Sequence, residues 1–357
     1  MTCWASSPGE FYVDRTTGLL TLIPISGKTL RDTDEVWVSV NDTVVTLTDK
    51  TDVTLRDLTV AYARTSGVVV SGGSGILLDN LTVHNIGGTA IDVTGADHTV
   101  RGCSISYVGM GALSVGGGDL KTLTGSGNMI SGNTMTKFAQ CKRTYEPAVG
   151  WSGVGHSVIN NTISNAPHCG ILGGGNDMLF EGNTLDHLGY EVDDSGAFYT
   201  GRQWQNRGNV VRGNTFSNIR AQVPTYLGYP SVQGLYLDDQ MSGYTIYNNT
   251  FKAVQTGIMI GGGRRNHVKW NHFEDCDTGI EFDNRGVGYT GKAVSAETMR
   301  VAVSDRAHNS CASTCFVRAH AGLRRLGDHL AGSARSMLSR KLDTWQPRSA
   351  TEAARPN

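Results

Sequence analysis

The chain has 357 residues, with 31 lysines and arginines against 32 aspartates and glutamates, and this balance favours neither nucleic acid nor an anionic membrane as a partner. Its 46 glycines, 8 prolines and 39% hydrophobic content describe a folded protein with many turns. No apolar run approaches the roughly 18 residues of a membrane-spanning helix, which excludes a transmembrane chain. The seven cysteines form neither a disulfide framework nor paired zinc ligands, so we expect no metal.

The first 43 residues carry no repeat. The stretch after Met1 has neither the basic start nor the apolar segment of a secretory signal. We expect residues 1–43 to be an N-terminal cap or the remnant of an upstream region.

A four-residue phrase then recurs, with an apolar residue at its end. Successive copies end at positions 60, 83, 105, 135, 163, 185, 216, 251 and 273, so the spacings are 23, 22, 30, 28, 22, 31, 35 and 22 residues. A base period of 22 with inserted loops is typical of a solenoid whose coils bury their apolar faces against their neighbours. The sequence predicts an all-β protein, a right-handed parallel β-helix over residues 44–288.

A second phrase, a small residue followed by a short strand, appears in most coils. Its alternation with a period of two residues predicts which side chains point inward and which are exposed on one outer sheet. The inward set is Ile91, Leu113, Ile171, Leu235, Ile258 and Ile280, and the outward set is Asp92, Ser114, Leu172, Tyr236, Met259 and Glu281.

A recurring asparagine is expected to stack at one turn of every coil. Asparagine tolerates left-handed backbone angles there and satisfies backbone groups, so we interpret this ladder as structural. Its members are Asn133, Asn161, Asn183, Asn214, Asn249 and Asn271.

The repeat stops near residue 286. Apolar residues from Leu323 to Leu342 then recur every three to four positions with arginines between them, as on an amphipathic helix. We expect residues 289–357 to be a divergent tail, helical or disordered. A helix here would cap the open end of the solenoid rather than bind a membrane or a partner.

Acids, aromatic residues and a histidine crowd into residues 140–240. Aligning the coils on the small residue before each strand, with Gly196 as that residue in its coil, gives a predicted register. It places His168 over Asp194, Leu172 over Phe198, Phe198 over Tyr236, and Thr200 over Asp238.

Two acid pairs, Asp193 with Asp194 and Asp238 with Asp239, flank the strands of this region. Glycoside hydrolysis needs one carboxylic acid and one ionised carboxylate. The register separates Asp194 from Asp238 by six positions, roughly 20 Å along flat strands. Only a loop that folds back over the sheet would bring them to the roughly 5 to 9.5 Å that glycosidases use. The alternative is simple turn chemistry at both pairs.

Other side chains of this region suit a sugar. A free histidine titrates near neutral pH, so we expect His168 to orient or protonate Asp194 across the ladder. Tyr145, Tyr199, Trp204 and Tyr236 offer aromatic faces, and Arg202 offers a cationic fork for hydroxyls. Taken singly, each of these residues is also explained by packing.

Several motifs resemble those of β-helix glycoside hydrolases of the family 141 type. They are GVG at residues 153–155, NAPH at 165–168, GGND at 174–177, DDSGAFYTGR at 193–202 and LYLDD at 235–239, with GEFYVD at 9–14 before the repeat. The resemblance covers roughly residues 4–290, and residues 193–202 are its most specific part.

This resemblance implies a secreted or cell-surface enzyme that acts on fucosides or xylans of a polysaccharide. It places catalysis on Asp194 and Asp238, with Asp193, Asp239 and Glu191 as alternates. The matching motifs put Asn176 among the substrate-binding candidates beside His168, Tyr199, Arg202, Trp204 and Tyr236.

Two other function classes stay open. A polysaccharide lyase or uronate epimerase on the same fold would need a base and a charge neutraliser, either Arg202 or calcium held by the acid pairs. A non-catalytic solenoid would only bind glycan or protein on its flat sheet. For the glycosidase we expect a polysaccharide substrate, no cofactor, no nucleic-acid or membrane partner, and a monomer.

Overall fold

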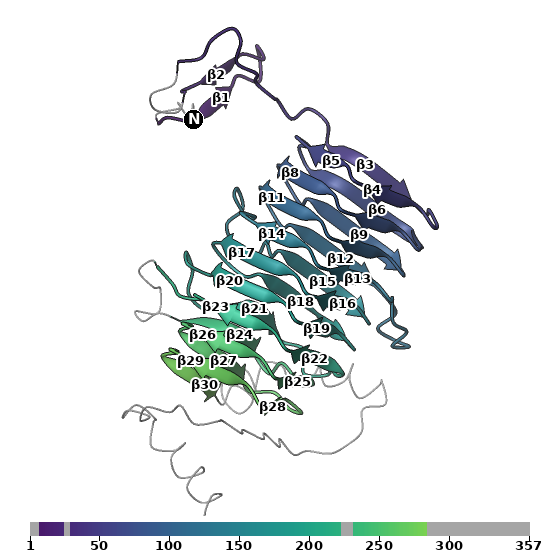
Figure 1. Cartoon of the computed structure of the whole chain (residues 1–357), viewed down its shortest axis with the longest axis vertical. Coiled ribbons are helices and arrows are strands. Elements are labelled where there is room, and N and C mark those ends of the chain that lie inside the picture. The colour runs from purple at the N-terminus through teal and green to yellow at the C-terminus, as the bar shows by residue number, and fades with distance from the viewer. Residues whose placement is uncertain (1–6, 25–28, 223–230, 284–357) are drawn as a thin grey trace, which may run out of the picture. The chain divides into compact units, whose positions relative to one another are not determined.

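A computed structural model describes residues 7–24, 29–222 and 231–283, and these residues form an all-β protein (Figure 1). Three long parallel sheets wind into a right-handed β-helix, as the repeat predicts. No helix occurs in the described ranges, and accordingly none there is long and apolar enough to cross a membrane. The predicted C-terminal helix lies outside the described residues.

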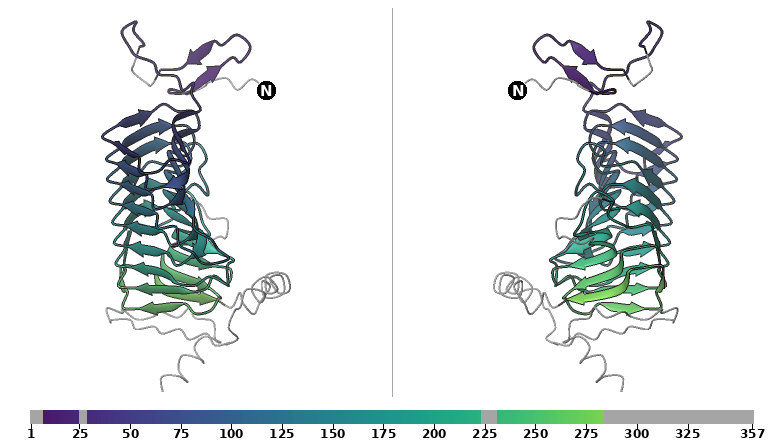
Figure 2. Two further views of the ribbon diagram at one scale, coloured as in Figure 1. Left: turned by 90° about the vertical axis from the view of Figure 1, so that its right-hand side faces the viewer. Right: turned by 90° about the vertical axis from the view of Figure 1, so that its left-hand side faces the viewer.

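Nine coils of the solenoid each contribute one strand to each parallel sheet, a further strand extends one of the sheets, and side views show the coils stacked one on another (Figure 2). The ten-stranded sheet, here called the site sheet, contains β3 (Thr43–Thr48), β6 (Ser66–Ser74), β9 (Ile91–Ala96), β12 (Leu113–Gly117), β15 (Val149–Val154), β18 (Ile171–Asn176), β21 (Ser195–Gly201), β24 (Val232–Asp238), β27 (Thr256–Gly261) and β30 (Thr278–Asp283).

Two nine-stranded sheets complete the coils. The first contains β4 (Thr54–Arg56), β7 (Leu77–Asp79), β10 (Thr99–Arg101), β13 (Met129–Ser131), β16 (Ser157–Ile159), β19 (Leu179–Glu181), β22 (Asn209–Arg212), β25 (Tyr244–Tyr247) and β28 (His267–Lys269). The second contains β5 (Thr59–Ala61), β8 (Thr82–Ile86), β11 (Ser104–Val108), β14 (Thr134–Thr136), β17 (Thr162–Ala166), β20 (Thr184–Leu188), β23 (Thr215–Ser217), β26 (Thr250–Lys252) and β29 (His272–Glu274). Before the coils, β1 (Phe11–Val13) and β2 (Leu20–Leu22) form an antiparallel hairpin.

The predicted inward ladder of the site sheet is confirmed. Ile91 pairs with Leu113, Leu235 with Ile258, and Ile258 with Ile280, and all of these except the half-buried Ile280 are at most 1% exposed. The predicted outward residues lie on the other face. The expected exposure is wrong for Tyr236 and Met259, which are 1% and 4% exposed, because neighbouring side chains cover this part of the outer face.

The asparagine ladder is also confirmed as a structural device. Asn183 accepts hydrogen bonds at Oδ1 from both the backbone N–H and the side-chain amide of Asn161, at 3.0 and 2.9 Å, and donates to Asn214 in the next coil. One detail of the prediction is wrong. The left-handed backbone belongs to the preceding residue of each coil, such as Asn160 with φ of 55°, because the buried amide must point along the stack.

Candidate functional site

The site sheet places the acids and tyrosines of residues 190–240 on one outer surface. Tyr199 on β21 pairs with Leu172 on one side and with Tyr236 on the other, while Gly201 pairs with Asp238. Since alternate residues face opposite ways, Tyr199, Tyr236 and Asp238 all lie on the outer face.

The predicted register of this coil is therefore wrong by one residue. Ala197, rather than Gly196, takes the position of the small residue beside Gly170. The carbonyl oxygen of Ala197 accepts a hydrogen bond from the N–H of Gly170 at 2.8 Å. The true register points Phe198 inward, in line with Ile171 and Leu235, where it is fully buried. A slip of one residue would expose the Phe198 ring and bury Tyr199 with its polar hydroxyl. Burial of the more apolar side chain, Phe198, therefore decides the register.

Tyr199 and Tyr236 stack at the centre of this surface, with ring centroids 5.2 Å apart and ring planes 24° apart. The hydroxyl of Tyr199 donates a hydrogen bond to Asp238 Oδ2 at 2.9 Å. The hydroxyl of Tyr236 donates to Asp194 Oδ1 at 3.0 Å. Each tyrosine of the stack thus holds one carboxylate. The corrected register separates the two acids by seven positions along neighbouring strands, since Gly201, seven positions after Asp194, pairs with Asp238.

The two acids differ in their surroundings. Asp238 is 5% exposed and accepts a second hydrogen bond, from the backbone N–H of Asp239 at 2.9 Å. Asp194 is exposed and has a left-handed backbone with φ of 51° at the end of the loop before β21. One carboxylate is therefore fixed by two donors, while the other faces solvent.

Burial raises the pKa of Tyr199 far above that of a free phenol, and the negative charges of Asp238 and Asp194 raise it further. The phenol stays protonated at any ordinary pH and acts as a permanent donor. Both carboxylates therefore raise the pKa of the same hydroxyl.

Two of the three alternate acids, Asp239 and Glu191, form ion pairs with arginines. Asp239 forms an ion pair with Arg202 at 2.9 Å, and the Arg202 side chain remains 77% exposed. Glu191 forms an ion pair with Arg143, with Nε donating to Oε2 at 2.9 Å. This pair joins the loop before β21 to the insertion before β15. Asp193 is half-buried in the same loop.

His168 does not lie over Asp194 as the register predicted. Its Nδ1 is 3.0 Å from Cys169 Sγ, and its ring lies 4.8 Å from that of Tyr145, which in turn lies 6.5 Å from Tyr199. Burial lowers the pKa of His168 to about 4, so the imidazole is neutral near pH 7 and does not supply a proton there. Burial also raises the pKa of the Cys169 thiol, which argues against a nucleophilic thiolate.

Two further candidates have structural contacts. One face of Trp204 is covered by the guanidinium of Arg264, 3.9 Å from the ring. Asn176 is 7% exposed and accepts a hydrogen bond from the backbone N–H of Arg207 at 2.9 Å, so it closes a turn. The Trp204 Nε1 is buried without a hydrogen-bond partner among the described residues, whereas the Asn176 side-chain oxygen is used in the turn.

Two residues that the sequence did not single out lie next to the acids. The Ser195 hydroxyl and the Gln233 carbonyl oxygen are buried, and neither has a hydrogen-bond partner among the described residues. Such orphaned polar atoms are rare in folded proteins and mark places where a ligand or water completes the bonding. Ser195 follows Asp194 directly, and its coil pairs with that of Gln233. A single serine and a single glutamine form no recognisable motif, so the sequence alone did not indicate that Ser195 and Gln233 belong to the site.

Comparison with known proteins identifies the fold. The family model described as right-handed β-helix region matches residues 43–143 and 147–297. A solved structure named "Glycoside hydrolase" aligns with a TM-score of 0.60 and 16% identity over 76% of this chain and 56% of that chain. A second, named "The complex structure of XylC with xylose", aligns with a TM-score of 0.34 and 10% identity over 62% and 36% of the two chains. The curated proteins give no match.

Proposed function

Since the chain belongs to the right-handed β-helix region family, whose stacked strands offer a long continuous face, we propose that it is a glycoside hydrolase that cleaves a polysaccharide lying on its site sheet. The observation that carries this proposal is the stacked Tyr199–Tyr236 pair with one carboxylate hydrogen-bonded to each hydroxyl. The first structural neighbour bears the name of such an enzyme, although the chain spans only 56% of its length.

Asp238 is the better candidate for the ionised carboxylate. Its burial holds it in one geometry, and a phenol and a backbone N–H both donate to it. In this role it attacks the anomeric carbon or takes a proton from the attacking water.

Asp194 is then the acid that protonates the leaving oxygen. It is exposed at the end of a loop, where it can reach a bound polymer, and Tyr236 orients one of its oxygens. In the overall reaction water adds across the glycosidic bond: the anomeric carbon gains a hydroxyl, and the departing oxygen gains a proton.

The aromatic surface suits a sugar ring. Tyr145 is 58% exposed, and its ring lies 6.5 Å from that of Tyr199, so it can pack on the apolar face of a pyranose beside the acids. Together with the family 141 resemblance, this favours fucosides or xylans as substrates and a secreted or cell-surface location.

The test is hydrolysis of a panel of plant and algal polysaccharides by the purified chain, followed as new reducing ends. We expect Asp238→Asn and Asp194→Asn each to abolish turnover with a nearly unchanged thermal melt. Asp92→Asn is the matched control, because Asp92 belongs to the same outward row of the site sheet several coils away. Wild-type rates in both site variants would overturn the proposal.

The lyase alternative has one supporting feature, the exposed guanidinium of Arg202 beside the acids. A lyase forms an unsaturated uronate, which absorbs ultraviolet light, and a calcium-dependent lyase loses activity with a chelator. We expect reducing ends without that absorbance, and full activity in the chelator. The absorbance would assign the chain to the lyases.

A further inference from the structure

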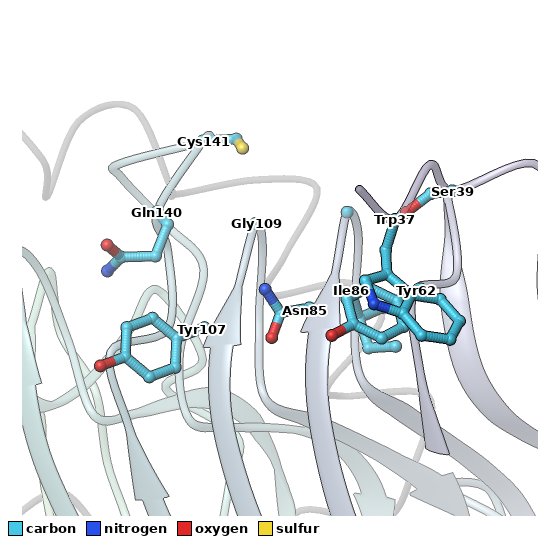
Figure 3. A pocket seen from close by; sticks show the side chains of 10 residues that line it. Trp37, Ser39, Tyr62, Asn85, Ile86, Tyr107, Gly109, Gln140 and Cys141 are labelled. Atoms are coloured by element: carbon cyan, nitrogen blue, oxygen red, sulfur yellow. The ribbon is translucent and has the colours of Figure 1, made fainter. Parts of the chain in front are cut away.

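A pocket of about 280 Å³ lies over the N-terminal coils and shares no residue with the candidate site. Figure 3 shows Trp37 and Tyr62 on one side of it, Tyr107 on the other and Asn85 between them, with Gln140 on a loop above. The pocket combines aromatic rings with amides.

The aromatic walls are unusually open. Trp37 is 64% exposed although it stacks on Tyr62, with ring centroids 5.1 Å apart and planes 7° apart. Tyr107 is 52% exposed. Exposed aromatic clusters of this kind mark contact surfaces, because large rings left in water forgo the free energy of burial.

The backbone beneath the pocket carries a conformational cost. Tyr62, Asn85 and Tyr107 occupy equivalent turn positions of three successive coils, all left-handed, with φ of 60°, 55° and 54°. Asparagine adopts this conformation readily, whereas a bulky residue pays of order 1 kcal/mol or more. Later coils place Lys137, Asn165, His187, Asn218, Ala253 and Asp275 at the same position, so the turn accepts several residue types. Within the described coils, phenol rings occupy it only at Tyr62 and Tyr107, and both line the pocket.

A cation orients Tyr107. The ammonium of Lys137, in the next coil of the same row, lies 2.6 Å from the phenol oxygen and 4.5 Å from the ring centroid. The ten lining residues themselves include no carboxylate and no cation, so beside the aromatic rings their polar groups are the amides of Asn85 and Gln140, the Ser39 hydroxyl and the Cys141 thiol.

We propose that this pocket is a second carbohydrate-binding site, which holds an uncharged stretch of the polysaccharide while another stretch occupies the candidate active site. A pyranose ring packs on Tyr107 or on the Trp37–Tyr62 stack, and the amides of Asn85 and Gln140 bond its hydroxyls. The ligand class rests on the proposed function, but the pocket does no chemistry.

The test is affinity electrophoresis in gels that contain arabinoxylan or fucosylated xyloglucan as neutral polymers, and polygalacturonate as an anionic one. Asp238→Asn is the parent, so that no polymer is cut during the run. Trp37→Ala removes an exposed ring, and Tyr107→Asn installs the residue that Asn85 and Asn165 already carry at this position. We expect each to weaken retention by a neutral polymer at least tenfold.

Trp270→Asn is the matched control. Trp270 is 52% exposed, has φ of 55° and lies outside the pocket, so its loss should leave retention unchanged. Thermal melts check folding, and Trp37→Ala alone decides the matter if Tyr107→Asn does not fold. Retention equal to the parent in the folded pocket variants, or a parent that binds neither neutral polymer, overturns the proposal. Pocket-dependent retention without any hydrolysis by wild type would instead overturn the proposed function alone.

Discussion

Tyr199 donates a hydrogen bond of 2.9 Å to Asp238, a residue 39 positions later that lies beside it only because two coils stack in register. The neighbouring Tyr236 reaches back to Asp194 in the same way. The stacking of the coils thus brings Asp194 and Asp238, which are distant in the sequence, onto one surface, where each carboxylate accepts a hydrogen bond from a tyrosine hydroxyl.

Replacing Tyr199 by phenylalanine removes the donor to Asp238 and keeps the stacked ring. A hydrogen bond to a charged group contributes about 1.5 to 3 kcal/mol, which corresponds to a fall in kcat of about 10- to 150-fold. We expect KM to change less, because the ring remains. Steady-state kinetics on the best polysaccharide measure both. Tyr247→Phe, whose hydroxyl accepts a hydrogen bond from Arg212 outside the site, is the control. An unaltered kcat in Tyr199→Phe would show that this bond does not serve catalysis.

His168 should make the protein less stable in acid. Burial lowers its pKa to about 4, whereas an unfolded histidine titrates near 6.5. Between these values the unfolded chain binds a proton that the folded chain does not, so the free energy of unfolding falls as pH drops from about 6.5 to 4, by up to about 3 kcal/mol. Burial lowers the pKa of His98 and His156 as well, and they act in the same direction.

The variant His168→Gln should therefore lose less stability than wild type between pH 7 and pH 4.5. Urea unfolding at the two pH values measures this difference. The exposed His272 is replaced in the same way as a control, and that variant should follow wild type. Identical pH dependence in His168→Gln and wild type would refute the assignment.

The asparagine ladder should dominate the stability of the coils. Asn183 is fully buried, and Asn183→Ala leaves the backbone N–H of Asn161 and the carbonyl of Val158 without their partners. Each orphaned group costs about 1 to 3 kcal/mol, so we expect the free energy of unfolding to fall by about 3 kcal/mol or more.

Asn218→Ala is the comparison for the ladder, because Ala253 already occupies the equivalent left-handed turn with φ of 54°. It should cost less than about 1 kcal/mol. Chemical denaturation compares the two variants, and equal losses would mean that the buried ladder contributes no more than an exposed turn.

The sequence predicted the coils and the inward ladder because period-two alternation is a property of each strand alone. It failed at Gly196 and Ala197, where two adjacent small residues allow two alignments and only the burial of Phe198 decides between them. It also left the partners of Glu191 and Asp239 open, since inserted loops and long side chains set these pairs. The Trp37 pocket was missed because nothing local places that segment beside Tyr62.

The candidate acids were found from the sequence, but their connection was not. A flat-strand estimate gives no link between Asp194 and Asp238, whereas in the structure each acid accepts a hydrogen bond from one of two stacked tyrosines. Tyr199 and Tyr236 were named as aromatic faces for a sugar, but the predicted register set Phe198 rather than Tyr199 beside Tyr236, so their stack was not foreseen.

Release of reducing ends from polysaccharide by wild type, Asp238→Asn and Asp92→Asn is the most direct test of the proposed hydrolase. We expect release by wild type and by Asp92→Asn, and none by a folded Asp238→Asn. Undiminished release by Asp238→Asn, or none by wild type across the panel, would contradict it.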